Sequence, residues 1–157
     1  GGVPLARGAA SFGAAWGAFA ETPGRDTAGI FEGCLSGDIR LLYVMGSDPA
    51  VRYHDPARAV AALDAVEFLV VQELFLTETA RRADVVLPAA SFAEKDGTFV
   101  NTEGRAQAIR QAIPPRGESR PDWRILAELI ALLGAPAPYF SARDVAREIA
   151  RTVAAAG

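Results

Sequence analysis

The sequence predicts a three-layer α/β domain with a mostly parallel sheet. Three apolar runs, at residues 39–45, 67–72 and 84–88, have the length of strands. These runs are continuous rather than alternating, which is typical of strands that are buried on both faces in a parallel sheet. Helical patterns lie between the runs, as expected when helices cover a sheet.

The first part of the chain contains one indistinct segment and one helix. Residues 1–25 are rich in glycine and alanine and predict a weakly structured segment or a frayed helix that ends at Pro23-Gly24. Asp26 or Thr27 can cap the next helix, and Gly37 can end it. Cys34 falls on the apolar stripe of this helix, so we expect a buried thiol and not a nucleophile.

The middle of the chain alternates strands with helical segments. A turn at residues 46–49 follows the first strand, and a helix at about residues 56–63 returns the chain to the second. A helical turn near residues 77–82 then precedes the third strand. His54 lies in a connecting loop without an obvious partner, which favours a solvated or hydrogen-bonded histidine.

A hairpin and two helices complete the prediction. Residues 98–112 predict a β-hairpin insertion, in which the segments 98–101 and 105–112 flank a turn. Gly104 in this turn suits a position with positive φ. A helix opens at Pro121-Asp122, and its Ile125, Leu126, Leu129, Ile130 and Leu133 are expected to face the sheet. Ser141 and Asp144 have the spacing of a capping box at the start of the last helix.

The composition limits the classes of function. With 157 residues the chain is expected to form a single domain (1–157), and it begins with Gly1 rather than Met, so we expect a fragment of a longer chain. A net charge of −3 gives no reason to expect nucleic acid as a partner. One cysteine and one histidine cannot supply a zinc or iron–sulfur site, and a lone cysteine fits a reducing compartment. The sequence shows no secretory signal or membrane-spanning run.

Polar residues follow the predicted strands at one edge of the sheet, where open α/β sheets bind ligands. They are Asp48, Gln72, Glu73 and Lys95, with Asp122 near a helix start. A carboxylate suits the N1–H and exocyclic amine of guanine, and a lysine suits a phosphate. Each residue also has a purely structural interpretation. Asp48 can be a turn residue, Gln72 and Glu73 can end a strand in solvent, and Lys95 can balance the charge of its neighbours. Asp122 can be the acidic residue of a helix N-terminus. Neither common glycine-rich phosphate loop follows a strand, which disfavours a standard dinucleotide or P-loop site.

A long stretch, FLVVQELFLTETARRADVVLPAASFAEKDGTFVNTEGRAQ, resembles the molybdopterin oxidoreductase superfamily. The segments GDIRLLYVMGSDP and RPDWRILAELIALLG extend the resemblance from about Gly24 to Gly134. Within the superfamily, the chain looks most like the large iron–sulfur subunit (the G-type subunit) of respiratory NADH:quinone oxidoreductase, complex I. Formate dehydrogenase catalytic subunits are nearly as similar. The resemblance implies a Rossmann-like fold that holds a molybdopterin guanine dinucleotide along the strand edge.

The resemblance also assigns the edge residues. The asparagine of a Gly-x-Asn-Pro turn falls on Asp48, and a Gln-Asp pair falls on Gln72 and Glu73. The lysine of a Glu-Lys-x-Gly loop falls on Lys95, and an aspartate before tryptophan falls on Asp122. Asp48 and Glu73 depart from the common pattern, and both changes would weaken binding of a polyanion. Together they favour a vestigial cofactor edge, although Gln72 and Lys95 keep the catalytic alternative open.

The resemblance implies a structural domain of complex I, cytoplasmic and in the peripheral arm of a membrane-bound complex. Its partners would be upstream domains of the same chain and other subunits, without direct membrane insertion. No catalytic residue, metal ligand or cofactor is expected in this fragment, because the iron–sulfur clusters would lie on upstream domains. The alternative is the pterin-binding domain of a molybdenum-dependent formate dehydrogenase. An alternative of another class is a stand-alone guanine-nucleotide-binding module.

Overall fold

The computed structural model of the chain describes residue 13 and residues 22–156. Most of the segment predicted at residues 1–25 therefore lies outside the described residues. The first complete element is α2 (Thr27–Ser36), which Asp26 caps by accepting a hydrogen bond from the Gly29 N–H. Gly37 ends this helix in the left-handed conformation with φ of 81°, as the sequence predicts.

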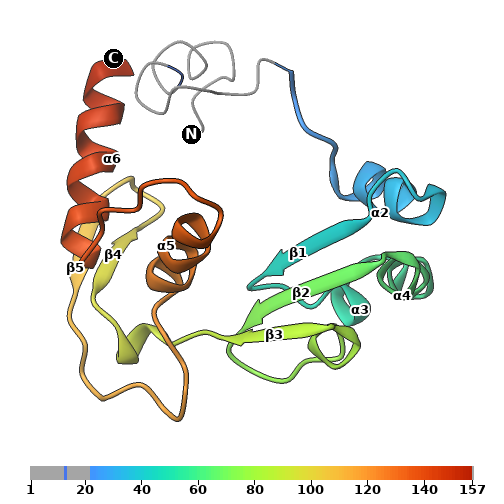
Figure 1. Cartoon of the computed structure of the whole chain (residues 1–157). Helices are drawn as coiled ribbons and strands as arrows, with labels where there is room; N and C mark the ends of the chain where they lie inside the picture. The colour runs from blue at the N-terminus through green and yellow to red at the C-terminus, as the bar shows by residue number, and fades with distance from the viewer. Residues whose placement is uncertain (1–12, 14–21, 157) are drawn as a thin grey trace.

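The central sheet has three parallel strands in the order β1-β2-β3 (Figure 1). They are β1 (Leu41–Met45), β2 (Phe68–Glu73) and β3 (Val85–Pro88). Between β1 and β2 lie α3 (Pro49–Arg52) and α4 (Pro56–Ala65), and the 3-10 helix η1 (Ala80–Arg82) precedes β3. The alternation of strands and helices confirms the predicted α/β class and the parallel sheet.

The hydrophobic core lies between this sheet and helices α2 to α4. One cluster joins Leu69 and Val71 of β2 to Leu63 of α4 and to Ala50 and Ala80. A second cluster is formed by α2 and α4, with Phe31, Cys34, Ala59 and Ala62. Cys34 is a free, buried thiol whose pKa is raised by burial, which matches its predicted place in the core.

The prediction that all three strands are buried on both faces is wrong. Residues 69–72 of β2 are buried, but Leu41, Met45, Phe68 and Val85 are exposed. The strand register places these four side chains on one face of the sheet, opposite the face occupied by Leu69 and Val71. Successive right-handed crossovers from β1 to β2 to β3 lie on the same face, so the helices between these strands do not cover the other face. On that other face Val70 and Gln72 are still buried, and Asp122 of α5 contacts Gln72.

The second half of the chain forms a hairpin and two long helices beyond the carboxyl ends of the parallel strands (Figure 1). The 3-10 helix η2 (Phe92–Glu94) leads into the antiparallel pair β4 (Gly97–Val100) and β5 (Ala106–Ile109). Gly104 in the connecting turn has φ of 80°, which confirms the predicted glycine turn. Helices α5 (Asp122–Leu132) and α6 (Ala142–Ala156) follow.

The predicted apolar stripe of α5 is only partly correct. Ile125 is buried, but Ile130 and Leu133 are exposed, and Leu133 lies at the C-cap beyond the last helical residue. The buried residues of the helix lie in its first half, so its C-terminal apolar residues have no surface to cover among the described residues. The predicted Ser141–Asp144 capping pair at the start of α6 is confirmed, since the Asp144 N–H donates to Ser141 Oγ over 3.3 Å.

Candidate functional site

The five predicted edge residues occupy the carboxyl end of the parallel sheet and the elements beside it. Asp48 follows β1, Gln72 and Glu73 end β2, Lys95 follows η2, and Asp122 is the first residue of α5. The structure brings Gln72, Lys95 and Asp122 into direct contact. Asp48 and Glu73 make their hydrogen bonds elsewhere.

Asp122 is the centre of the polar network. Its Oδ1 atom accepts a hydrogen bond of 2.7 Å from Nε2 of Gln72, and its Oδ2 atom accepts one from Nζ of Lys95. Gln72 is completely buried, whereas the side chains of Lys95 and Asp122 are 21% and 30% exposed. The network is therefore shielded from solvent at Gln72 and partly open at Lys95 and Asp122, so any ligand would approach from the side of these two residues.

Local sequence places both charged partners. Pro121 immediately precedes Asp122, and an acidic residue in the first turn of a helix interacts favourably with the helix dipole. Lys95 directly follows η2, where Ser91 and Glu94 form a reciprocal capping box. Glu94 also accepts a hydrogen bond of 3.2 Å from the Arg116 N–H, which joins this segment to the loop before α5.

Tyr43 also belongs to the network, although the sequence pattern does not predict it. Its hydroxyl donates to Oε1 of Gln72, from the neighbouring strand β1. Burial raises the pKa of Tyr43, and the negative charge of Asp122 raises it further, so the phenol keeps its proton. The sequence feature that could have indicated this role is a tyrosine in an otherwise aliphatic strand, two residues before the strand ends. In the sequence pattern the tyrosine counts only as part of the apolar run.

Asp48 has a structural role at the turn after β1. Its Oδ1 atom accepts hydrogen bonds from the backbone N–H of Thr79, over 3.0 Å, and from the Thr79 hydroxyl, over 2.6 Å. Thr79 is completely buried and in turn accepts from the Ala50 N–H over 3.1 Å. Asp48 thus joins the β1–α3 turn to the segment before η1.

Glu73 is directed towards its own backbone. Its Oε1 atom accepts a hydrogen bond of 2.7 Å from the Leu74 N–H, and Glu73 is partly buried. The carboxylate is therefore placed at the strand end without contact to Lys95 or Asp122.

The described edge does not fit a polyanionic dinucleotide in this arrangement. Asp48, Glu73 and Asp122 contribute three carboxylates and Lys95 one ammonium group, so these residues carry a formal charge of −2. The charge of Lys95 is compensated by Asp122, and both ends of the Gln72 amide are already hydrogen-bonded. The cavity beside Lys95 and Asp122 has a volume of about 260 Å³, which is below the range of roughly 300–1,000 Å³ that is usual for small-molecule sites.

Among the residues that the structure describes, no group of three or more histidine, cysteine, aspartate or glutamate side chains has an arrangement that could hold a metal ion. No described helix combines the length and the apolar character needed to cross a membrane.

Comparison with known proteins identifies related sequences. The chain is 55% identical over 97 residues to the F420-dependent formate dehydrogenase subunit alpha of Methanocaldococcus jannaschii, covering 62% of this chain and 14% of that protein. It is 44% identical over 117 residues to the F420-dependent formate dehydrogenase 2 subunit alpha of Methanococcus maripaludis, covering 73% and 17%. It is also 41% identical over 141 residues to the G 2 subunit of the NADH-quinone oxidoreductase of Rhizobium meliloti, covering 89% and 16%.

A solved structure has the same fold. The acetylene hydratase from Pelobacter acetylenicus matches with a TM-score of 0.62 and 23% identity, over 68% of this chain and 15% of that chain. All four of these proteins are much longer than the matched region, and the chain spans only 14–17% of their lengths. The model of the molybdopterin oxidoreductase family matches residues 5–132, which is most of the sequence. The chain belongs to the molybdopterin oxidoreductase family.

Proposed function

We propose that the chain is a structural domain of the large iron–sulfur subunit of an NADH:quinone oxidoreductase, and that its cofactor edge is vestigial. The observation that carries this proposal is the Lys95–Asp122 ion pair together with the buried Gln72 amide that donates to the same aspartate. A lysine kept for a phosphate would leave its charge available to the ligand, whereas this lysine is neutralised by a carboxylate.

Two further observations support this proposal. Asp48 and Glu73, the two departures from the common superfamily pattern, make hydrogen bonds with Thr79 and Leu74, so both have a role in the fold without a cofactor. The relative named as an NADH-quinone oxidoreductase subunit matches 89% of the chain. In this proposal the domain lies in a cytoplasmic peripheral arm, and its partners are further domains of the same polypeptide, which hold the clusters, and other subunits.

A second candidate is the pterin-binding domain of a molybdenum-dependent formate dehydrogenase. It is favoured by the relatives named as formate dehydrogenase subunits and by the presence of Gln72 and Lys95. In this case Lys95 would exchange Asp122 for a phosphate of the cofactor, and Gln72 and Asp122 would face the guanine. The pterin group would supply the redox chemistry, and the described residues would bind and orient its nucleotide end.

Cofactor analysis of a longer polypeptide that contains this chain distinguishes the two candidates. We expect neither molybdenum by elemental analysis nor pterin by fluorescence, both in the wild type and in Lys95→Ala. Lys95→Ala should lower the free energy of unfolding by roughly 1–3 kcal/mol, because Asp122 loses a charged hydrogen-bond partner. Arg105→Gln is the matched control, since Arg105 makes no side-chain ion pair within the described residues.

The presence of pterin would contradict the proposal. Stoichiometric pterin in the wild type and in Arg105→Gln, but not in Lys95→Ala, would reject the vestigial edge and establish the formate dehydrogenase type of site.

A further inference from the structure

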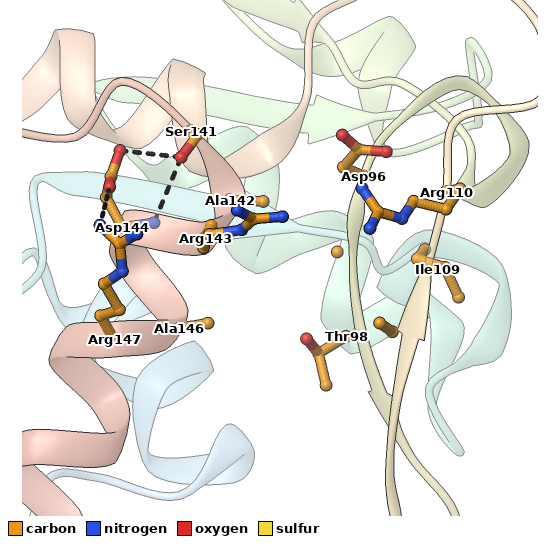
Figure 2. A pocket seen from close by; sticks show the side chains of 12 residues that line it. Asp96, Thr98, Ile109, Arg110, Ser141, Ala142, Arg143, Asp144, Ala146 and Arg147 are labelled. Carbon is orange, nitrogen blue, oxygen red and sulfur yellow. Dashed lines mark hydrogen bonds and ion pairs between the residues drawn. The ribbon is translucent and has the colours of Figure 1, made fainter.

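A second cavity lies between the β4–β5 hairpin and the first turns of α6 (Figure 2). Its volume is about 550 Å³, which is within the range of roughly 300–1,000 Å³ that is usual for small-molecule sites. The smaller cavity beside Lys95 shares several of its lining residues, namely Asp96, Gly97, Thr98, Ala142 and Ala146. The two cavities are therefore adjacent, and the larger one is independent of the Gln72–Asp122 contact.

Three arginines from two separate elements line this cavity. Arg110 follows the last residue of β5, whereas Arg143 and Arg147 lie on α6. In Figure 2 the side chains of Arg110 and Arg143 extend from opposite walls into the space between the hairpin and α6. The lining thus contains three arginines and two aspartates, Asp96 and Asp144, in a chain whose net charge is −3.

The available positive charge belongs to Arg110 and Arg143. Arg147 pairs with Asp144 over 3.2 Å, but neither Arg110 nor Arg143 forms an ion pair within the described residues. Asp144 is also held by Ser141, whose hydroxyl donates to Oδ2 over 2.8 Å. That hydrogen bond is the largest cause of the lowered pKa of Asp144, so the carboxylate remains ionised and paired with Arg147.

We infer that this cavity binds a small anion that carries a diphosphate group. An arginine fork binds phosphate oxygens bidentately, and a fork on each of two walls allows each arginine to bind one of two linked phosphoryl groups. Thr98 lines the same space and provides a hydroxyl donor, whereas the Ser141 hydroxyl already donates to Asp144. The cavity has room for more than inorganic diphosphate, so a nucleoside or other organic diphosphate is the natural class of ligand. This inference does not depend on whether the cofactor edge is vestigial.

Asp96 allows a test in the opposite direction, because its negative charge should weaken the binding of an anion. Its Oδ1 atom accepts a hydrogen bond of 2.8 Å from the Gln111 N–H, and its carboxylate lines the cavity beside Arg110. A carboxylate there repels an incoming polyanion. Replacement by asparagine keeps an oxygen for the Gln111 N–H and removes the negative charge, so it should improve binding.

Titration of the 157-residue chain with inorganic pyrophosphate, followed by calorimetry, tests the site. We expect saturable binding that weakens as the salt concentration rises. Arg110→Gln and Arg143→Gln should each weaken binding roughly tenfold, because each removes a charge-assisted contact. Asp96→Asn should tighten it a few-fold. Arg151→Gln is the matched control, because Arg151 lies on the same helix two turns beyond Arg143 and does not line the cavity.

Any one of three results would overturn the inference. They are the lack of saturable heat with pyrophosphate, equal binding by Arg143→Gln and Arg151→Gln, and binding of inorganic phosphate as tight as that of pyrophosphate. Thermal melting of each variant separates a lost contact from a lost fold, and the exposed position of Arg110 and the lack of ion pairs at Arg143 make loss of the fold unexpected.

Discussion

At the scale of single residues, the most constrained polar side chain at the edge is Gln72. It is completely buried, so both ends of its amide need partners. The Tyr43 hydroxyl donates to Oε1 and Asp122 accepts from Nε2, which together determine the orientation of the amide. Asp122 in turn holds Lys95, so one buried glutamine connects β1, β2, α5 and the loop after η2.

Removal of the Tyr43 hydroxyl should therefore destabilise the fold. In Tyr43→Phe the buried Oε1 atom of Gln72 loses its donor, and a buried unsatisfied acceptor costs about 1–3 kcal/mol. Urea denaturation measures the change in the free energy of unfolding. Tyr53→Phe is the control, because Tyr53 packs against Phe31 and His54 and its hydroxyl has no hydrogen bond within the described residues. Equal stability of the two variants would contradict this account of the network.

At the scale of elements, the short helix η2 is held by its own capping box and positions Lys95. Glu94 accepts from the Ser91 N–H over 2.8 Å and from the Arg116 N–H over 3.2 Å. The pKa of Glu94 is lowered, first by the Ser91 backbone hydrogen bond and then by the Ser91 side chain. The ionised carboxylate thus stabilises the turn from which Lys95 extends.

The lowered pKa of Glu94 predicts the direction of a pH dependence. The folded-state pKa lies below the unfolded value, which is about 4.3 for glutamate. Its contribution to stability is therefore complete above that value, and it is lost as the pH falls through the lowered folded-state pKa. Unfolding by urea at a series of acidic pH values should show a smaller loss of stability on acidification for Glu94→Gln than for the wild type. Glu118→Gln, which removes an exposed carboxylate without a hydrogen bond among the described residues, should follow the wild type.

At the scale of the whole molecule, the sheet is covered by helices α2 to α4 on one face only within the described residues. Leu41, Met45, Phe68 and Val85 project from the other face. Parallel sheets usually have both faces covered, so this exposed apolar surface is unusual for the architecture. Val70 and Gln72 on the same face are nevertheless buried, so the exposed apolar side chains belong to the outer strands and to the start of β2.

Two matched substitutions test this one-sided core. Leu69 is 1% exposed and Leu41 is 59% exposed, and the two residues lie on opposite faces of adjacent strands. Leu69→Ala should cost about 2–5 kcal/mol, because it removes buried methyl groups and leaves a cavity. Leu41→Ala should cost less than about 1 kcal/mol, since most of its side chain already contacts water. Similar losses in the two variants, measured by thermal or urea unfolding, would show that the exposed face is covered in solution.

The sequence alone was sufficient for the features that depend on local chemistry. Apolar runs and turn residues predicted three parallel strands, and the glycine at position 104 predicted the hairpin turn. Cap spacing predicted the start of α6 at Ser141, and a helical apolar stripe predicted the burial of Cys34. These features follow from backbone sterics and side-chain periodicity within a few residues of the chain.

Only the tertiary structure decided which polar groups meet and which apolar groups stay exposed. Asp48 bonds with Thr79 rather than with the other edge residues, and Tyr43 reaches Gln72, in both cases across about thirty positions of sequence. Phe68 and Leu69 are neighbours in one apolar run, yet only Leu69 is buried. A continuous apolar run carries no information about which face the helices cover, because that choice is made by the packing of distant segments.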